Sequence, residues 1–174
     1  QLLLKDNGPA YFSFYYPFID TVSHKFGPRS IETFSTVQKA LRNIESFLCQ
    51  VSGKVSNTLF LLTADHGQIS LDPTSVFYVD KEIPQAESLL RRSRNGDLLV
   101  PSGSTRDFYL HVNDGHVDEL LNILRNAADG RARVLLTRDL IRDGFFGSSA
   151  PSNTFLRNIG DIVILPEKGL GAFW

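Results

Sequence analysis

The chain has 174 residues, 42% of them hydrophobic, and a formal charge of -1 from 18 basic and 19 acidic side chains. This length suits one compact domain, with room for an appended subdomain but not for two large domains. The balanced charge excludes the strongly basic surface that binds nucleic-acid polymers or anionic membranes, and the single cysteine, Cys49, excludes an intrachain disulfide.

The first seventy residues predict a strand, a helix and a second strand. Aromatic residues dominate positions 10–16, which favours a strand that ends at Pro17. A helix is predicted from Ser30 to about Gly53, because apolar residues recur there at three- and four-residue spacing, at Phe34, Val37, Leu41, Ile44 and Leu48. The run at 58–62 is apolar on both faces, as buried parallel strands are. This order predicts a βαβ unit.

The sequence after residue 70 predicts short elements and polar loops. Alternation over 108–112 indicates a half-buried strand, and Val117, Leu120, Leu121 and Leu124 form one helical stripe that ends near Gly130. Further strands are predicted over 133–136 and 161–165. The predicted fold class is therefore α/β, with a mainly parallel sheet, flanking helices and a small α+β cap or insertion. We expect residues 1–75 and 158–174 to form the core and residues 76–157 to form the cap.

Two carboxylate and imidazole pairs stand just beyond the predicted strands of the first region. Asp20 and His24 are four residues apart, so one helical turn would bring them to one face. Asp65 and His66 follow the strand at 58–62, and Gly67 would allow a sharp turn there. If the two strands are parallel, both pairs lie at the same carboxyl edge of the sheet, where open α/β sheets bind ligands.

The chemistry of these pairs suggests a site for two divalent metal ions. Mixed oxygen and nitrogen ligands suit zinc first, with manganese or iron as alternatives, whereas magnesium and calcium prefer oxygen alone. Two ions about 4 Å apart can stabilise the attacking and leaving oxygens of a phosphoryl transfer. The simpler alternative for each pair taken alone is a surface ion pair at Asp20 and His24, and a capped turn at Asp65 and His66.

The two motifs resemble those of the type I phosphodiesterase/nucleotide pyrophosphatase family of the alkaline phosphatase superfamily. Its motif Pro-Asp-x-x-Gly-His-x-x-Gly-Pro is matched by Asp20, His24, Gly27 and Pro28, and its later Asp-His-Gly motif is matched by Asp65, His66 and Gly67. The resemblance implies that Asp20 and His24 bind one metal ion and that Asp65 and His66 bind the other. Ile19, Ser23 and Gln68 depart from the family pattern, which has proline, glycine and commonly methionine at these positions.

The resemblance also implies site residues for which this sequence offers no match. The family has a further metal-binding Asp and a Thr or Ser nucleophile upstream of these motifs, and a last metal-binding His near its C-terminus. Because the sequence begins at Gln1 and stops soon after the strand at 161–165, we expect it to be part of a longer protein that carries these residues. The catalytic nucleophile is therefore unknown, and we expect these 174 residues alone to be inactive.

The remaining histidines and the other polar side chains considered are predicted to have structural roles. His111 lies on the alternating strand and His116 lies just before a helix, so neither is included in the site. Ser35 and Thr36 lie inside the predicted helix, which excludes them as nucleophiles. Arg106 and Asp107 are interpreted as a surface ion pair.

By this resemblance, the parent protein hydrolyses phosphate diester or pyrophosphate bonds of small, nucleotide-like substrates through a covalent phospho-Thr or phospho-Ser intermediate. The alternatives are other chemistry of the superfamily, namely phosphomonoester, phosphonate or sulfate ester hydrolysis or phosphomutase action, and a non-catalytic module that keeps the metal frame. No membrane segment or signal peptide is indicated, so we expect a soluble, cytoplasmic protein.

Overall fold

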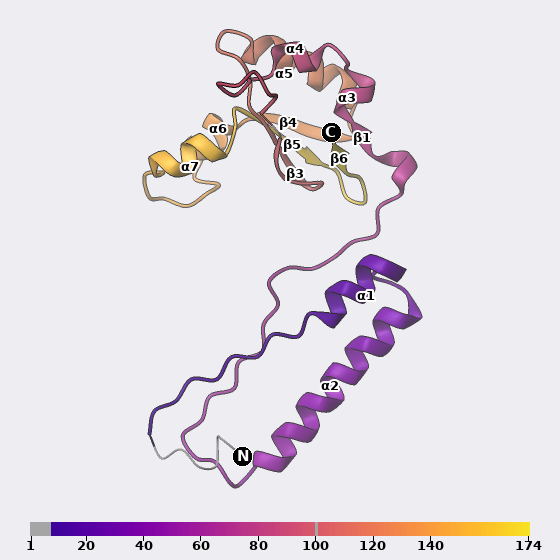
Figure 1. Cartoon of the computed structure of the whole chain (residues 1–174), viewed down its shortest axis with the longest axis vertical. Coiled ribbons are helices and arrows are strands. Elements are labelled where there is room, and N and C mark those ends of the chain that lie inside the picture. The colour runs from indigo at the N-terminus through magenta and orange to yellow at the C-terminus, as the bar shows by residue number, and fades with distance from the viewer. Residues whose placement is uncertain (1–7, 100) are drawn as a thin grey trace. The chain divides into compact units, whose positions relative to one another are not determined.

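A computed structural model describes residues 8–99 and 101–174, so the predictions that include residues 1–7 and Val100 lie partly outside it. The chain divides into two compact units, Gln1–Ser70 and Leu71–Trp174 (Figure 1). Its helices and strands form a mixed α/β structure, which confirms the predicted class. The arrangement of strands differs from the prediction in both units.

The first unit contains two helices joined by a tight turn. Helix α1 spans Phe18–Phe26 and ends at Gly27, which has a φ of 92°. Helix α2 spans Ile31–Val51, as predicted, and the Ser30 hydroxyl caps it by accepting a 3.1 Å hydrogen bond from the Thr33 amide. The Thr33 hydroxyl in turn donates to the Gly27 carbonyl at 2.8 Å. Side-chain hydrogen bonds therefore fix the turn between the helices.

The strands predicted at 10–16 and 58–62 belong to no β-ladder in the described part of the chain, so the βαβ prediction for this unit is wrong. Both segments are exposed, with Phe14 at 99% and Leu59 at 81% of full exposure. Figure 1 accordingly draws both as coil. An apolar run becomes a buried strand only when neighbouring strands pair with its backbone, and the described residues of this unit provide none.

The second unit is built around a four-stranded antiparallel sheet of order β2-β3-β5-β4. Its strands are β2 (Ser102–Ser104), β3 (Asp107–Leu110), β4 (Ala132–Leu136) and β5 (Ile162–Pro166). The short strands β1 (Phe77–Tyr78) and β6 (Ala172–Phe173) pair in parallel. The prediction of a mainly parallel sheet is therefore wrong for the described residues, where parallel pairing is confined to β1 and β6.

Strands β3 and β4 flank β5 and run in the same direction, because each is antiparallel to β5. Helix α5 (Val117–Ala128) connects them, which confirms the predicted smaller βαβ-like unit in a split form. Strand β5 was expected to return to the sheet of residues 1–75. The structure differs, because its alternating apolar side chains pack on both faces of the sheet of the second unit.

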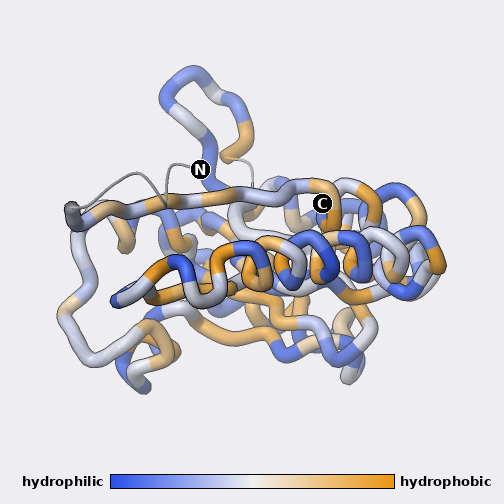
Figure 2. The backbone as a smooth tube through the Cα atoms, turned by 90° about the horizontal axis from the view of Figure 1, so that it is seen from below, coloured by the Kyte–Doolittle hydropathy of each residue, from blue (hydrophilic) through white to orange (hydrophobic). Residues whose placement is uncertain are grey.

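Each face of this sheet has its own apolar cluster. The larger one joins alternate residues of the strands, such as Phe108 and Ile164, to Leu120 and Leu124 of α5. The smaller one lies on the opposite face, where Tyr109, Val163 and Ile159 meet side chains of α6 (Thr137–Arg142) and α7 (Asn153–Asn158). Figure 2 colours the chain by hydropathy, with hydrophobic and hydrophilic stretches interspersed along the tube. The second unit thus has a two-sided core.

The rest of the second unit consists of short helices that precede the sheet. They are a 3-10 turn at Pro73–Ser75, α3 at Val79–Glu82 and α4 at Ala86–Leu89. Val79 and Ala86 are fully buried in the larger cluster. These elements contribute side chains to the larger cluster.

Candidate functional site

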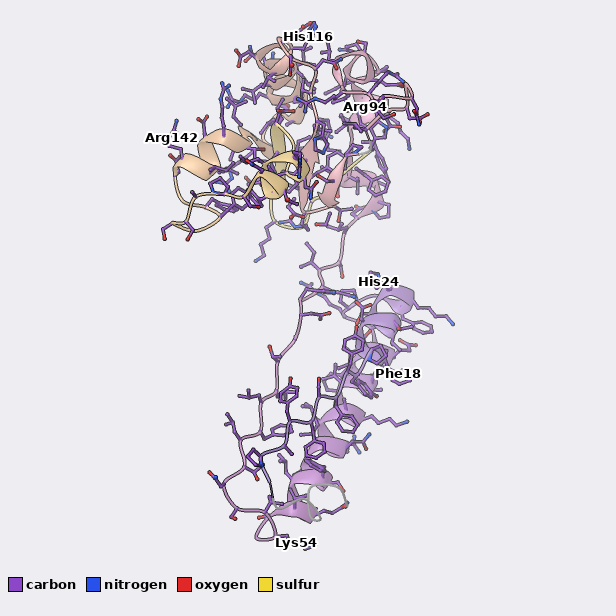
Figure 3. The ribbon with its side chains drawn as sticks, turned by 60° about the vertical axis from the view of Figure 1, so that its left-hand side comes forward. Phe18, His24, Lys54, Arg94, His116 and Arg142 are labelled. Carbon is purple, nitrogen blue, oxygen red and sulfur yellow. The ribbon has the colours of Figure 1, made fainter. Side chains whose placement is uncertain are left out.

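The first predicted pair lies on α1, as the one-turn prediction required. The Asp20 Oδ1 and His24 Nε2 atoms are 3.4 Å apart, and the side chains are 42% and 73% exposed. Four-residue spacing places them on one face of the helix. Figure 3 labels His24 near the end of α1 and Phe18 at its start. The pair is open to solvent and accessible to an ion or a ligand.

The second predicted pair lies on the extended segment that follows the apolar run at 58–62. Asp65 Oδ1 accepts a 3.0 Å hydrogen bond from the His66 amide, and Asp65 Oδ2 is 3.9 Å from His66 Nε2. The His66 Nδ1 atom lies 3.1 Å from the Gly67 carbonyl oxygen. Gly67 does not have a positive φ, and the chain bends at Asp65, two residues before it. Local bonds along the chain hold this pair.

One residue links the two pairs, and the sequence analysis treated it only as a departure from the family pattern. The Gln68 side-chain amide donates to Asp20 Oδ1 and lies 3.5 Å from the Asp20 carbonyl oxygen. Gln68 follows His66 by two residues and is separated from Asp20 by 48. The sequence did contain a signal for this contact, because Gln68 can form hydrogen bonds where the family commonly has an apolar methionine.

The donor chemistry of the four residues fits a transition metal, because each pair offers a carboxylate oxygen and an imidazole nitrogen. The number of donors is smaller than a stable site needs. Over residues 8–99 and 101–174, no three His, Cys, Asp or Glu side chains gather closely enough to hold one ion. The assignment of two metal ions, zinc first, to Asp20, His24, Asp65 and His66 therefore stays a prediction.

The sheet-edge argument does not account for the position of these residues. It required parallel strands before each pair, and the structure instead places one pair on α1 and the other on an extended segment of the same unit. Helix geometry positions the first pair, and the contact between Gln68 and Asp20 relates it to the second.

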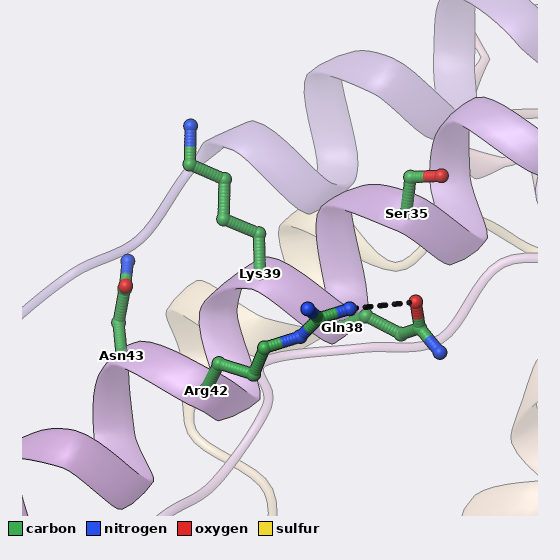
Figure 4. A pocket seen from close by; sticks show the side chains of 5 residues that line it. All are labelled: Ser35, Gln38, Lys39, Arg42 and Asn43. Carbon is green, nitrogen blue, oxygen red and sulfur yellow. Dashed lines mark hydrogen bonds between the residues drawn. The ribbon is translucent and has the colours of Figure 1, made fainter.

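A surface hollow of about 310 Å³ lies along α2, away from the predicted residues in sequence. Figure 4 shows its lining, including the 3.2 Å hydrogen bond from Arg42 to Gln38. All five lining side chains are exposed and come from α2: Ser35, Gln38, Lys39, Arg42 and Asn43. Such a shallow helix surface lacks the apolar lining and converging polar groups of a binding pocket.

Helix α2 also provides no activated nucleophile. The Thr36 hydroxyl donates to the Glu32 carbonyl oxygen at 2.8 Å, one turn back along the helix. Ser35 is exposed on the same helix. The described contacts give neither hydroxyl a neighbouring base, which agrees with the sequence interpretation.

The two remaining histidines, His111 and His116, contact residues of the second unit. His111 is half-buried, and burial lowers its pKa, while Asp161 opposes and Arg91 reinforces this shift. Its backbone carbonyl accepts a 2.8 Å hydrogen bond from the Arg91 amide. His116 is the residue before α5 and pairs with Glu119 at 2.9 Å. Their exclusion from the site stays a prediction.

Arg106 and Asp107 do not form the expected ion pair. Arg106 donates to the backbone carbonyls of Glu167 and Leu170, at 2.8 and 2.5 Å. Asp107 instead accepts from the Ser104 amide at 3.0 Å. The two side chains therefore tie the loop before β6 and the turn between β2 and β3, respectively.

Comparison with known proteins gives one family. The model of the type I phosphodiesterase / nucleotide pyrophosphatase family matches residues 2–172. No curated protein matches the sequence significantly. Over the described residues, no helix is both long and apolar enough to span a bilayer. The family suggests a phosphodiester or pyrophosphate hydrolase, and its match extends over nearly the whole sequence, well beyond the two motifs. The chain belongs to the type I phosphodiesterase/nucleotide pyrophosphatase family.

Proposed function

We propose that the parent protein hydrolyses phosphate diester or pyrophosphate bonds of small, nucleotide-like substrates with the help of two divalent metal ions. The observation that carries the proposal is the family match over residues 2–172, together with the two carboxylate and imidazole pairs that the family motifs identify. Asp20 and His24 would hold one ion, and Asp65 and His66 the other. Ions at these positions would supply positive charge toward the phosphoryl oxygens.

The proposed reaction has two displacements at phosphorus. The hydroxyl oxygen of a Thr or Ser, for which this sequence offers no candidate, forms a bond to phosphorus while the bond to the leaving oxygen breaks, and the leaving oxygen receives a proton. Water then forms a bond to phosphorus while the bond to the Thr or Ser oxygen breaks, and that oxygen regains its proton. The sum is hydrolysis of one phosphate ester or anhydride bond.

The test uses the full-length protein and a bis(p-nitrophenyl) phosphate assay after chelation and after addition of zinc or manganese. We expect Asp20→Ala and His66→Ala to lower metal-dependent activity by at least about 100-fold, because each removes one proposed ligand. The Asp20 side chain is 42% exposed and the His66 side chain 58%, so neither belongs to a core and the fold should survive. His111→Ala is the matched control and should cost much less. Equal losses at His66 and His111 would show that the wrong histidine is assigned to the site.

The same assay separates the alternatives. Faster turnover of a phosphate monoester or a sulfate ester than of the diester would indicate other chemistry of the superfamily. Metal binding without turnover of any of these substrates by the full-length protein would indicate a non-catalytic module.

For these 174 residues alone, we expect weak metal binding and essentially no turnover. Each pair supplies two donors, and covalent catalysis without the attacking hydroxyl leaves only binding and charge stabilisation. Calorimetric titration with zinc beside the diester assay measures both properties. Sub-micromolar binding with metal-dependent turnover would show that the site is complete in this chain.

A further inference from the structure

A turn of the second unit contains an asparagine followed by a glycine. The sequence has this dipeptide twice, at 7–8 and at 95–96, and only the second lies wholly in the described part of the chain. Asparagine is chemically labile, because its side-chain carbonyl carbon can be attacked by the backbone nitrogen of the next residue. Glycine hinders this attack least, since it has no Cβ atom and leaves the backbone free to rotate. Asn95 therefore has a reactive neighbour.

The dipeptide lies at the exposed tip of a short hairpin. Arg92 and Leu98 form an antiparallel bridge at its base, and the Ser93 amide donates to the Asp97 carbonyl at 2.7 Å. The three residues between Ser93 and Asp97 are all exposed, and Figure 3 labels the first of them, Arg94. A three-residue loop that ends in a glycine of positive φ is a common hairpin connection, and that φ is 87° here.

The surroundings leave both reacting groups open to water. Apart from its chain neighbours, no atom of the described residues lies within 4 Å of a Cβ built on Gly96. Asn95 bonds through its backbone amide to Ser93 Oγ at 3.2 Å, and over the described residues its side chain has no hydrogen bond. One bond opposes the attack, because the Gly96 amide donates to the Ser93 carbonyl at 3.0 Å. That bond closes only the exposed turn, and such bonds open at little cost in free energy.

We propose that Asn95 is a site of spontaneous deamidation, and that its isoaspartyl product opens the tip of the hairpin. The Gly96 nitrogen loses its proton and bonds to Cγ of Asn95, while the bond from Cγ to the side-chain nitrogen breaks and ammonia leaves with that proton. Water then adds to either carbonyl carbon of the succinimide ring, and the bond from that carbon to the Gly96 nitrogen breaks as the nitrogen regains a proton. Opening at Cγ gives aspartate, and opening at the backbone carbonyl carbon gives isoaspartate. The sum consumes one water and releases one ammonia.

The isoaspartyl product should disturb the hairpin and little else. It lengthens the main chain by one carbon atom, because a former side-chain carbon becomes part of it. The hydrogen bond from Ser93 to Asp97 spans this point and should lose its alignment. The change should stay local, because Leu90, just before the hairpin, is 1% exposed and bridges Val112. The proposal does not rest on the hydrolase function, since it involves no residue of the candidate site.

The first experiment follows the reaction in heavy-oxygen water. The folded 174-residue chain is aged at mildly alkaline pH, digested in ordinary water and analysed by mass spectrometry, so only deamidation during ageing introduces the label. The Asn95 peptide should carry at least about 10-fold more label than the Asn122 peptide, because Asn122 is also exposed but lies in α5 before Ile123. Asn95→Gln, which would have to form a larger ring, should lose the label.

The unfolded chain sets the duration of this experiment. Ageing continues until the chain unfolded in urea is labelled at Asn95. A folded chain that then carries no label there would overturn the proposal, because the turn would protect the side chain.

The second experiment measures hydrogen exchange in the separated isoaspartyl form. The Ser93 amide should exchange faster than in the fresh chain, whereas the amides of β5 should not change. Asn95→Asp is the matched control, because it adds the carboxylate without lengthening the main chain, and it should keep the protection of Ser93. Unchanged exchange in the isoaspartyl form, or an equal loss of protection in Asn95→Asp, would overturn the opening of the hairpin by the lengthened main chain.

Discussion

The two units of this chain differ in how their structure is stabilised. The second unit buries apolar residues on both faces of its sheet, including fully buried Leu110, Leu124 and Ile164. In the described part of the first unit, Ala40 is the only buried hydrophobic residue, and the other buried side chains are Ser23 and Thr33. The residues assigned to chemistry belong to the first unit. The region with the strongest functional signal therefore has the weakest core of its own.

The reason for the difference is pairing of the backbone. Strands β3, β4 and β5 satisfy one another's amides and carbonyls, and their alternating side chains then meet helices on both sides. The apolar segments at 10–16 and 58–62 lack such partners, so Phe14 and Leu59 stay in solvent. Similar apolar content gives a core in one unit and an exposed surface in the other. Four predictions test or refine this contrast, from the largest effect to the smallest.

Replacing a central core residue should strongly destabilise the second unit. Ile164 is fully buried in β5, and we expect Ile164→Ala to lower the free energy of unfolding by about 3 kcal/mol, through lost burial and an unfilled cavity. Trp174, the only tryptophan, packs against this core, so its fluorescence during urea unfolding measures the change. Leu41→Ala on α2, where the side chain is 51% exposed, is the control and should change stability by less than about 1 kcal/mol. Equal losses of stability in Ile164→Ala and Leu41→Ala would contradict the difference in core packing between the two units.

The close approach of the Leu110 backbone should make substitution of Gly160 destabilising. Gly160 has a φ of 73°, and a Cβ atom there would lie 2.8 Å from the Leu110 carbonyl oxygen. We expect Gly160→Ala to cost about 2 kcal/mol from strain and displacement of β3. Gly130 has nearly the same φ, 76°, and apart from its chain neighbours no atom of the described residues lies within 4 Å of a Cβ built there. Gly130→Ala therefore isolates the cost of the φ alone. Urea unfolding of both variants should rank Gly160→Ala as the less stable, and the reverse order would contradict the contact.

The buried hydroxyl of Thr137 should lower the stability of the second unit. Thr137 is 1% exposed, and its Oγ1 atom has no hydrogen-bond partner among residues 8–99 and 101–174. Thr137→Val keeps the shape and should raise the free energy of unfolding by about 1 kcal/mol, because it removes this unsatisfied group.

The matched control lies in the first unit. Thr33 is also buried, but its hydroxyl bonds to Gly27. Thr33→Val should therefore weaken amide protection in α2, as measured by hydrogen exchange. Destabilisation by Thr137→Val would mean that its hydroxyl is satisfied after all, for instance by water.

The smallest effect concerns pH and His111. Burial lowers the pKa of His111 below its ordinary value of 6.5, so the unfolded chain binds a proton at this residue more readily than the folded chain. Its contribution to stability is therefore present above about pH 6.5 and is lost as the pH falls through the lower folded pKa. The free energy of unfolding of the unsubstituted chain, measured relative to that of His111→Gln, should decrease as the pH falls from 7.5 to 5. A difference that is independent of pH would rule out this linkage.

Local geometry was largely predictable from the sequence. The helix α2 follows from apolar periodicity, and the one-turn spacing of Asp20 and His24 follows from the geometry of α1. The elements β3, α5 and β4 were also predicted near their observed positions. Each of these depends on residues that are close in the chain, where period and capping are decisive.

The sequence by itself thus determined α2, α5, the strands β3, β4 and β5, and the two carboxylate and imidazole pairs that match the family motifs. Only the tertiary structure decided which strands pair, that β5 lies between β3 and β4, and that Gln68 meets Asp20 across 48 residues. The physical reason is that strand pairing and long-range side-chain contacts depend on partners elsewhere in the chain. An apolar run such as 58–62 has the same local pattern whether or not a neighbouring strand is there to receive it.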